Sequence, residues 1–235
     1  MHSNSYTIGF VGIMTTVVAG ILALMFSGLK PIHDTNEALY NKKEILGSIK
    51  KGAADLEDSE VATIFTKNVK QFVLDANGIV IAEKGADKID MKKEKKKPEA
   101  ERKYPLYVYD GPEGKHYIVA VRGKGLWDEI WGSIAIKEDF NTIGGVAFNH
   151  TGETPGLGAE IKDNNSWKSQ FVGKKLFNEA GEFVSVDVVK GGIKIPNHQV
   201  DGISGATVTA VGVAKMLDKG IRIYLPYFKK LQNTK

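Results

Sequence analysis

The sequence predicts an α+β protein in which a single N-terminal transmembrane helix precedes one mixed-sheet domain. Three patterns support this: a long uncharged segment near the N terminus, short strand-like runs between turn residues, and a helical apolar pattern near the C terminus. The chain has 235 residues, of which 42% are hydrophobic and 26% are charged. It is therefore too apolar for a disordered protein and long enough for one sizeable domain plus an appendage.

The N-terminal segment 6–29 is the predicted membrane anchor. Its 24 residues carry no charge, and as a helix they extend about 36 Å, against a hydrocarbon core of about 30 Å. No Lys or Arg precedes the segment and no small-residue cleavage site follows it, which argues against a signal peptide. A buried core helix would have a polar face. We therefore expect a retained single span in contact with membrane lipid.

The remaining chain divides into a helical connector and one large domain. Apolar residues at helical spacing predict one or two helices leading away from the membrane. An Asn77-Gly78 pair between two apolar runs predicts a hairpin, and a charged, nearly apolar-free stretch follows it as a loop. The expected boundaries are 1–30 for the anchor, 31–66 for the connector, 67–235 for the domain and 84–103 for the charged loop.

The domain is predicted to contain several short strands and two helices. Strand-like runs between turn residues cover 106–109, 116–121, 133–136, 142–148 and 183–189. Apolar spacing favours helices over 160–171 and 209–220, with Gly220 as the stop signal of the second.

Composition and motif searches exclude several kinds of function. The chain has no cysteine, which rules out disulfides, thiolate zinc sites and cysteine-held iron–sulfur clusters. Of the basic residues, nine lie in 84–103 with five acidic ones; the rest of the chain has 23 of each, so no nucleic-acid partner is expected. The histidines are scattered, so no metal site is expected. The sequence has no complete GxGxxG motif and no P-loop, so no nucleotide site is expected. It also has no GxSxG motif, and we expect no catalytic residue.

Two segments have unusual backbone requirements for loops. HTGETPGLG, residues 150–158, combines three glycines and a proline, so its backbone can approach a ligand closely. DGISGATVTA, residues 201–210, leads into the second predicted helix with the hydroxyls of Ser204, Thr207 and Thr209 near its start. Backbone amides and the helix dipole at such a position favour a phosphate group.

These segments resemble the signatures of the periplasmic FMN-binding domain family. DGISGATVTA is similar to its flavinylation motif, HTGETPGLG to a second signature and GKGLWDEIWG to a third. Behind one N-terminal span, their order resembles that of the family members that serve as the C subunit of sodium-translocating NADH:quinone reductases. The resemblance covers nearly the whole chain.

The resemblance implies covalent FMN, joined by a flavin transferase through a phosphoester to Thr207. Thr209 is the nearest competing acceptor. The context recognised around the acceptor would be Asp201, Ser204, Gly205 and Ala206. The second signature would lie against the isoalloxazine ring through Glu153, Thr154, Gly156, Leu157 and Gly158, with Trp127 as a further ring contact.

The family's function implies an electron carrier within a multi-subunit, sodium-pumping NADH:quinone oxidoreductase, with NADH oxidised on another subunit. It also implies the bacterial inner membrane, with the large domain on the periplasmic side. Lys30, Lys42 and Lys43 follow the span and by charge bias alone would keep the domain in the cytoplasm. Two alternatives stay open: the homologous flavin-bearing G subunit of a ferredoxin:NAD reductase complex, and a cofactor-free membrane-tethered assembly module.

Overall fold

The computed structural model describes residues 4–50 and 52–233, and the chain forms two compact units, Met1–Tyr40 and Asn41–Lys235. The first unit consists of most of helix α1, Asn4–Gly47. Its most apolar stretch has a mean hydropathy of 2.3, and none of that stretch is buried. Pro31 stands inside the helix just beyond the apolar stretch. Because apolar side chains are exposed all around this helix, a lipid bilayer is the environment that would cover them.

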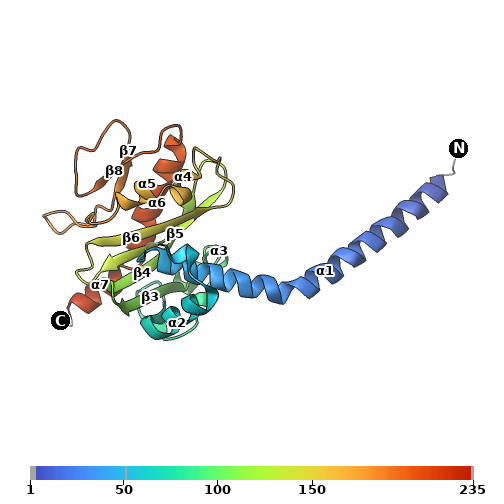
Figure 1. Ribbon diagram of the computed structural model, residues 1–235, viewed down its shortest axis with the longest axis horizontal. Helices are drawn as coiled ribbons and strands as arrows, with labels where there is room; N and C mark the ends of the chain where they lie inside the picture. Colours follow the sequence, from blue (N-terminus) through green and yellow to red (C-terminus); the bar gives the residue numbers. More distant parts are fainter. Residues whose placement is uncertain (1–3, 51, 234–235) are drawn as a thin grey trace. The chain divides into compact units, whose positions relative to one another are not determined.

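The second unit contains a six-stranded antiparallel sheet with the strand order β2-β1-β3-β4-β5-β6 (Figure 1). A separate parallel pair, β7 and β8, lies outside it. The α+β class is thus confirmed, with antiparallel and parallel pairing in two different sheets. The strands are β1 Val69–Leu74, β2 Val80–Ala82, β3 Tyr104–Gly111, β4 Gly114–Lys124, β5 Glu129–Lys137, β6 Ile143–His150, β7 Asp187–Val189 and β8 Gln199–Asp201.

Helix α6, Thr207–Arg222, covers one face of the sheet, and α7, Leu225–Gln232, follows it. Buried residues of α6 such as Val213 and Leu217 share one core cluster with the alternate strand residues that face them. The expected stop at Gly220 is wrong, because the helix continues past it. A Cβ atom at Gly220 would lie 2.6 Å from a methyl carbon of Val121, so this glycine permits close packing of α6 on β4.

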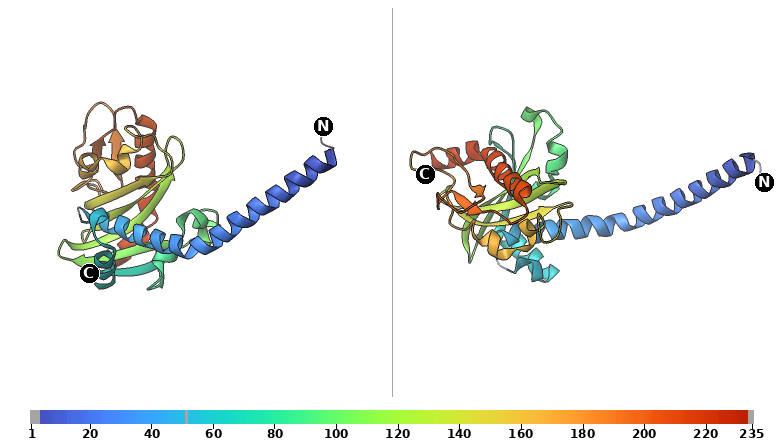
Figure 2. Two further views of the ribbon diagram at one scale, coloured as in Figure 1. Left: turned by 45° about the vertical axis from the view of Figure 1, so that its right-hand side comes forward. Right: turned by 90° about the horizontal axis from the view of Figure 1, so that it is seen from above.

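The opposite face of the sheet is covered by Asn41–Gly47, by the 3₁₀ turn η1, Ala53–Asp55, and by α2, Asp58–Asn68. Leu46 and Phe65 are buried there, and the rings of Phe65 and Tyr107 meet edge to face with centroids 6.0 Å apart. Seen from above, α6 and α2 lie on opposite sides of the sheet (Figure 2, right). The sheet is therefore the middle of three layers.

The helix expected over 160–171 is divided into α4, Glu160–Asp163, and α5, Asn165–Ser169. The break occurs at Asn164, whose side-chain oxygen accepts a hydrogen bond from the Trp167 amide and caps the second helix. Of the strand expected over 183–189, only β7 forms. The apolar spacing correctly predicts which side chains are buried here, but the cap at Asn164 determines where the helix is interrupted.

The charged segment 84–103 also differs from the expected loop. It folds into three short helices: η2 Ala86–Lys88, α3 Met91–Glu94 and η3 Glu99–Glu101. Its composition has few apolar residues to bury, so local capping and ion pairs organise it instead of a core.

Candidate functional site

A groove of about 550 Å³ lies at the N terminus of α6, a volume suited to a drug-sized ligand. All five residues expected around the flavin acceptor line it. Its other walls come from the turn between β4 and β5, from β7 and the loop after it, and from the first turns of α6. The lining residues are Leu126, Val188–Gly191, Asp201–Val208, Ala210 and Val211.

The two threonines of the motif lie in different environments. Thr207 is the first residue of α6, is exposed and lines the groove. Thr209 is 1% exposed, and its hydroxyl donates a 2.5 Å hydrogen bond to Oε2 of Glu153. A buried, hydrogen-bonded hydroxyl cannot reach a large reagent, so Thr207 is the accessible one of the two threonines.

The start of α6 also suits a phosphate. The residue before the helix is Ala206, which has no polar side chain to cap the first amides, and the first turn has no acidic residue. Unpaired amides at a helix N terminus attract an anion, and the helix dipole adds to that attraction.

Glu153 joins all three sequence motifs beneath the groove. Its carboxylate is buried, accepts the Thr209 hydroxyl through Oε2, and accepts the Trp127 amide through Oε1 at 3.0 Å. Any Cβ at Gly125 or Gly158 would collide with this carboxylate. These two glycines are therefore required for close packing around Glu153. Through its hydrogen bonds, Glu153 connects the β4–β5 turn to helix α6.

The signature loop, residues 150–158, contacts the acceptor motif, residues 201–210, through Leu157. A Cβ at Gly205 would lie 2.5 Å from Cδ2 of Leu157, and Gly205 itself has a φ of +75°. Gly156 has a φ of +73° with open space around its Cα, so its glycine is required by backbone conformation and not by a close neighbour. The carbonyl of Thr154 accepts the Leu157 amide and closes the turn.

Exposed apolar side chains lie in the groove that Thr207 lines, as Leu126, Val208 and Val211 do, or next to its lining residues, as Trp127 and Leu157 do. Leu126 and Trp127 of the β4–β5 turn are 49% and 67% exposed, and Val208 and Val211 of α6 are also exposed. With the exposed Leu157, they form an apolar rim that a flat aromatic ring could cover.

Sequence reasoning missed the wall formed by Val188, Val189, Lys190 and Gly191. This wall reaches the groove because β7 pairs in parallel with β8, whose last residue is Asp201. Such long-range pairing leaves no local signal. The burial of Thr209, in contrast, could have been inferred, because it precedes the core residue Val213 by four positions on the helix.

Comparisons with known proteins agree with this geometry. A family model described as an FMN-binding domain matches residues 125–222, which include every residue lining the groove. The C subunit of the Na(+)-translocating NADH-quinone reductase of Neisseria meningitidis serogroup B is 33% identical, covering 94% of this chain and 90% of that protein. The chain belongs to the family of C subunits of Na(+)-translocating NADH-quinone reductases.

Another member of this C-subunit family, from Vibrio alginolyticus, is 30% identical over 97% of this chain and 94% of its own length. The crystal structure of the C subunit from Parabacteroides distasonis superimposes with a TM-score of 0.75 at 38% identity. The match covers 85% of this chain and 96% of that chain. The family resemblance inferred from the three motifs is thereby confirmed over nearly the full length.

Proposed function

We propose that the protein is the membrane-anchored, flavin-carrying electron-transfer subunit of a Na(+)-translocating NADH-quinone reductase, with FMN joined by a phosphoester to Thr207. One observation carries the attachment site: Thr207 is exposed in the groove at the start of α6, whereas Thr209 is buried against Glu153. The FMN-binding domain match supports the cofactor.

The residues present fit FMN. The N terminus of α6 would hold the phosphate, and the apolar rim, with Leu126, Trp127 and Leu157, would cover the ring system. Bound FMN would supply the ability to accept and release electrons, while this chain binds, orients and shields it. A covalent link replaces an affinity by a permanently high local concentration.

The immediate partners follow from this role. Other subunits of the reductase would deliver and accept the electrons, and one of them would oxidise NADH. A flavin transferase would recognise the segment from Asp201 to Thr207 before or during assembly of the reductase. The names of the relatives reported above favour the C subunit of the sodium-translocating enzyme over the homologous G subunit of a ferredoxin:NAD reductase complex.

We place the large domain on the periplasmic side of the inner membrane, because flavin transfer in the family resembled here occurs there. Lys30, Lys42 and Lys43 oppose this orientation, but long domains cross membranes largely regardless of charge. Protease added to intact spheroplasts should digest the domain. Protection until the membrane is permeabilised would show a cytoplasmic domain instead.

Mass spectrometry of the mature protein tests the attachment. We expect the chain to gain the mass of FMN less one water, and fragmentation to locate the gain on Thr207. An unmodified mass in protein purified from cells that contain the flavin transferase would favour a cofactor-free assembly module.

A further inference from the structure

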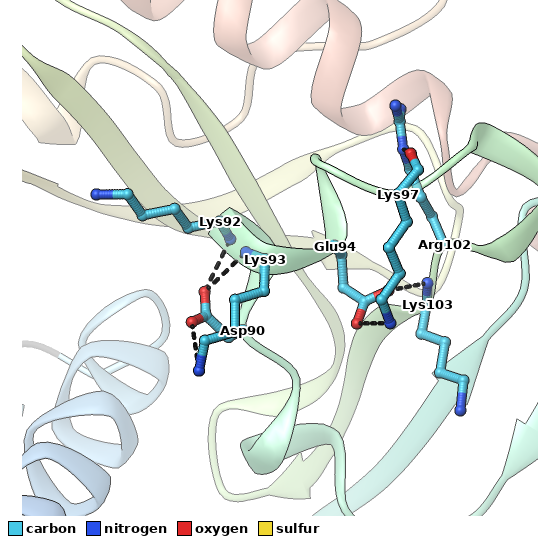
Figure 3. Close-up of polar contacts among 7 residues, drawn as sticks. All are labelled: Asp90, Lys92, Lys93, Glu94, Lys97, Arg102 and Lys103. Atoms are coloured by element: carbon cyan, nitrogen blue, oxygen red, sulfur yellow. Dashed lines mark hydrogen bonds and ion pairs between the residues drawn. The ribbon is translucent and has the colours of Figure 1, made fainter.

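The basic segment, residues 84–103, carries the whole net charge of the protein. It has nine Lys or Arg residues and five Asp or Glu residues, while the rest of the chain is balanced. Proteins usually distribute such charge over the surface. Here it is concentrated in one folded segment that contains η2, α3 and η3. Figure 3 shows seven residues of this segment, from Asp90 to Lys103.

Two of the five acidic side chains of the basic segment, those of Asp90 and Glu94, hold its backbone in place. Asp90 accepts hydrogen bonds from the amides of Lys92 and Lys93 at 2.9 and 3.2 Å and caps α3 (Figure 3). Glu94 is 7% exposed and accepts the amide of Lys103 at 2.9 Å. Burial opposes ionisation of both carboxyl groups, but the amides at Asp90 and the Lys97 side chain at Glu94 outweigh it and lower both pKa values. The backbone of the segment therefore has a defined conformation, and its basic side chains project from a folded surface.

Several lysines of the basic segment have no acidic partner. Lys84, Lys88, Lys95 and Lys96 are exposed, and within the described residues none of them forms an ion pair. No large apolar side chain is exposed between residues 84 and 103. Protein interfaces normally have an apolar centre, so this surface suits a partner that offers only negative charge.

A continuous series of contacts connects the basic segment to the start of the domain. Lys92 pairs with Glu129 at 3.4 Å, and Glu129 pairs with Arg122 at 2.7 Å. The Arg122 guanidinium lies over the ring of Trp131, 5.2 Å from its centroid, and the Trp131 indole donates a 3.3 Å hydrogen bond to Glu44. The basic segment is therefore connected through Glu129, Arg122 and Trp131 to Glu44, four residues after the first compact unit ends.

The tether between anchor and domain is short. Residues 30–40 separate the apolar segment from the second compact unit, and as a helix they extend about 16 Å. The length of this tether does not depend on how the domain is oriented. The tether therefore keeps the domain close to the membrane surface, and charges that come within the screening length of about 8 Å at physiological salt interact with lipid headgroups.

We propose that the basic segment binds the anionic headgroups of the membrane in which the protein is anchored. Glu129, which pairs with Lys92, immediately follows the β4–β5 turn that carries Leu126 and Trp127. Headgroup binding therefore brings the groove end of the sheet towards the bilayer. The inference depends on the anchor and the charged surface, and it does not require attached flavin.

The absence of native cysteine allows a direct test with the full chain in lipid nanodiscs. A nitroxide attached to Ala100→Cys in the basic segment should collide with a nickel-chelating lipid more often when phosphatidylglycerol replaces part of the phosphatidylcholine. A nitroxide at Ala180→Cys, in an exposed turn outside the segment, is the matched control. Each lysine near an anionic surface contributes about a fivefold preference, so three contribute ~100-fold.

Charge variants complete the experiment. Lys88→Gln, Lys95→Gln and Lys96→Gln together should abolish the increase at the Ala100→Cys probe. The control is Lys67→Gln, Lys70→Gln and Lys137→Gln, which removes equal charge from strand and helix ends elsewhere. An increase lost equally in both triple variants would overturn the proposal. So would equal collision rates in both bilayers, with the probe protected only in the assembled complex; that result would indicate an acidic protein partner.

Discussion

Thr209 donates its hydroxyl to the carboxylate of Glu153, so that two residues 56 positions apart meet beneath the groove at 2.5 Å. The same carboxylate accepts the Trp127 amide. One buried side chain thus fixes the β4–β5 turn, the signature loop and the acceptor helix relative to each other. The groove depends on this contact although Glu153 does not line it.

Replacing Glu153 should therefore loosen the site as well as the fold. Glu153→Ala leaves the Thr209 hydroxyl and the Trp127 amide without their acceptor, and each bond to a charged group contributes about 1.5–3 kcal/mol. We expect a clear loss of thermal stability and slower flavin attachment, with partial recovery in Glu153→Gln. Glu179→Gln, an exposed change, is the control for a lost carboxylate. Unaltered attachment and melting in Glu153→Ala would refute this role.

The acceptor assignment predicts opposite phenotypes for the two threonines. Thr207→Ala should abolish covalent flavin while changing stability by no more than about 0.5 kcal/mol, because the side chain is exposed. Thr209→Ala should retain covalent flavin but unfold more easily, because it removes the buried bond to Glu153. In-gel flavin fluorescence after denaturing electrophoresis, measured beside a melting curve, distinguishes them. A fluorescent Thr207→Ala band would move the attachment site elsewhere.

Gly205 allows a test of the contact between the two motifs. Gly205→Ala places a Cβ against Leu157, and its left-handed conformation costs an L residue about 1–2 kcal/mol. Gly181→Ala has the same conformational cost at a φ of +77° but has open space around it. Both should melt lower, and only Gly205→Ala should change the flavin absorption spectrum, because it displaces Leu157 over the groove.

The double variant Gly205→Ala with Leu157→Ala removes the collision and keeps the backbone strain. Its flavin spectrum should match that of Leu157→Ala alone. Equal spectra for Gly181→Ala and Gly205→Ala would mean that Leu157 has no influence on the flavin.

Local patterns in the sequence were sufficient for the membrane segment, the main strands and the position of α6. They were insufficient where packing between distant segments decides the structure. Gly220 has the composition of a helix stop, but its neighbour Val121 requires a glycine inside the helix. Asn164 interrupts a region whose apolar spacing continues through it. In both cases one side chain, Val121 or Asn164, outweighed the local sequence signal.

The same distinction applies to the groove. The motif from Asp201 to Thr207 was recognisable as a unit because its residues are consecutive. Lys190 and Val188 were not, because they reach the groove only through the parallel pairing of β7 with β8. Gly156 has a positive φ, which is a reason for glycine that composition alone did not identify, and its close approach to the flavin ring stays a prediction.

Glu44 predicts a pH dependence of stability in the region where the domain begins. Burial raises its pKa from 4.5 to about 6, against the opposing effects of hydrogen bonds from Trp131 and Asn149 and of the nearby Lys162 and Arg122. Its Oε1 atom is buried and has no hydrogen-bond partner among the described residues. An ionised carboxylate is therefore poorly accommodated at this position.

The direction of the effect follows from the two pKa values. Below pH 4.5, Glu44 is protonated in the folded and unfolded chains, and the stability associated with its protonated form is fully present. As the pH rises through 6, the folded protein loses about 2 kcal/mol relative to a chain with a neutral group at this position. Glu44→Gln should therefore gain on the wild type by that amount between pH 4.5 and 6, and no further above it.

Urea unfolding of the full chain in detergent, measured at several pH values from 4 to 8, provides the comparison. The pH-dependent part of the difference is the signal, because a constant offset reflects only the amide's different hydrogen bonding. Glu99→Gln, an exposed change in η3, should give a curve parallel to the wild type. If the Glu44→Gln curve is also parallel, Glu44 does not titrate in this range, and its carboxylate must have a partner or water contact that stabilises the charge.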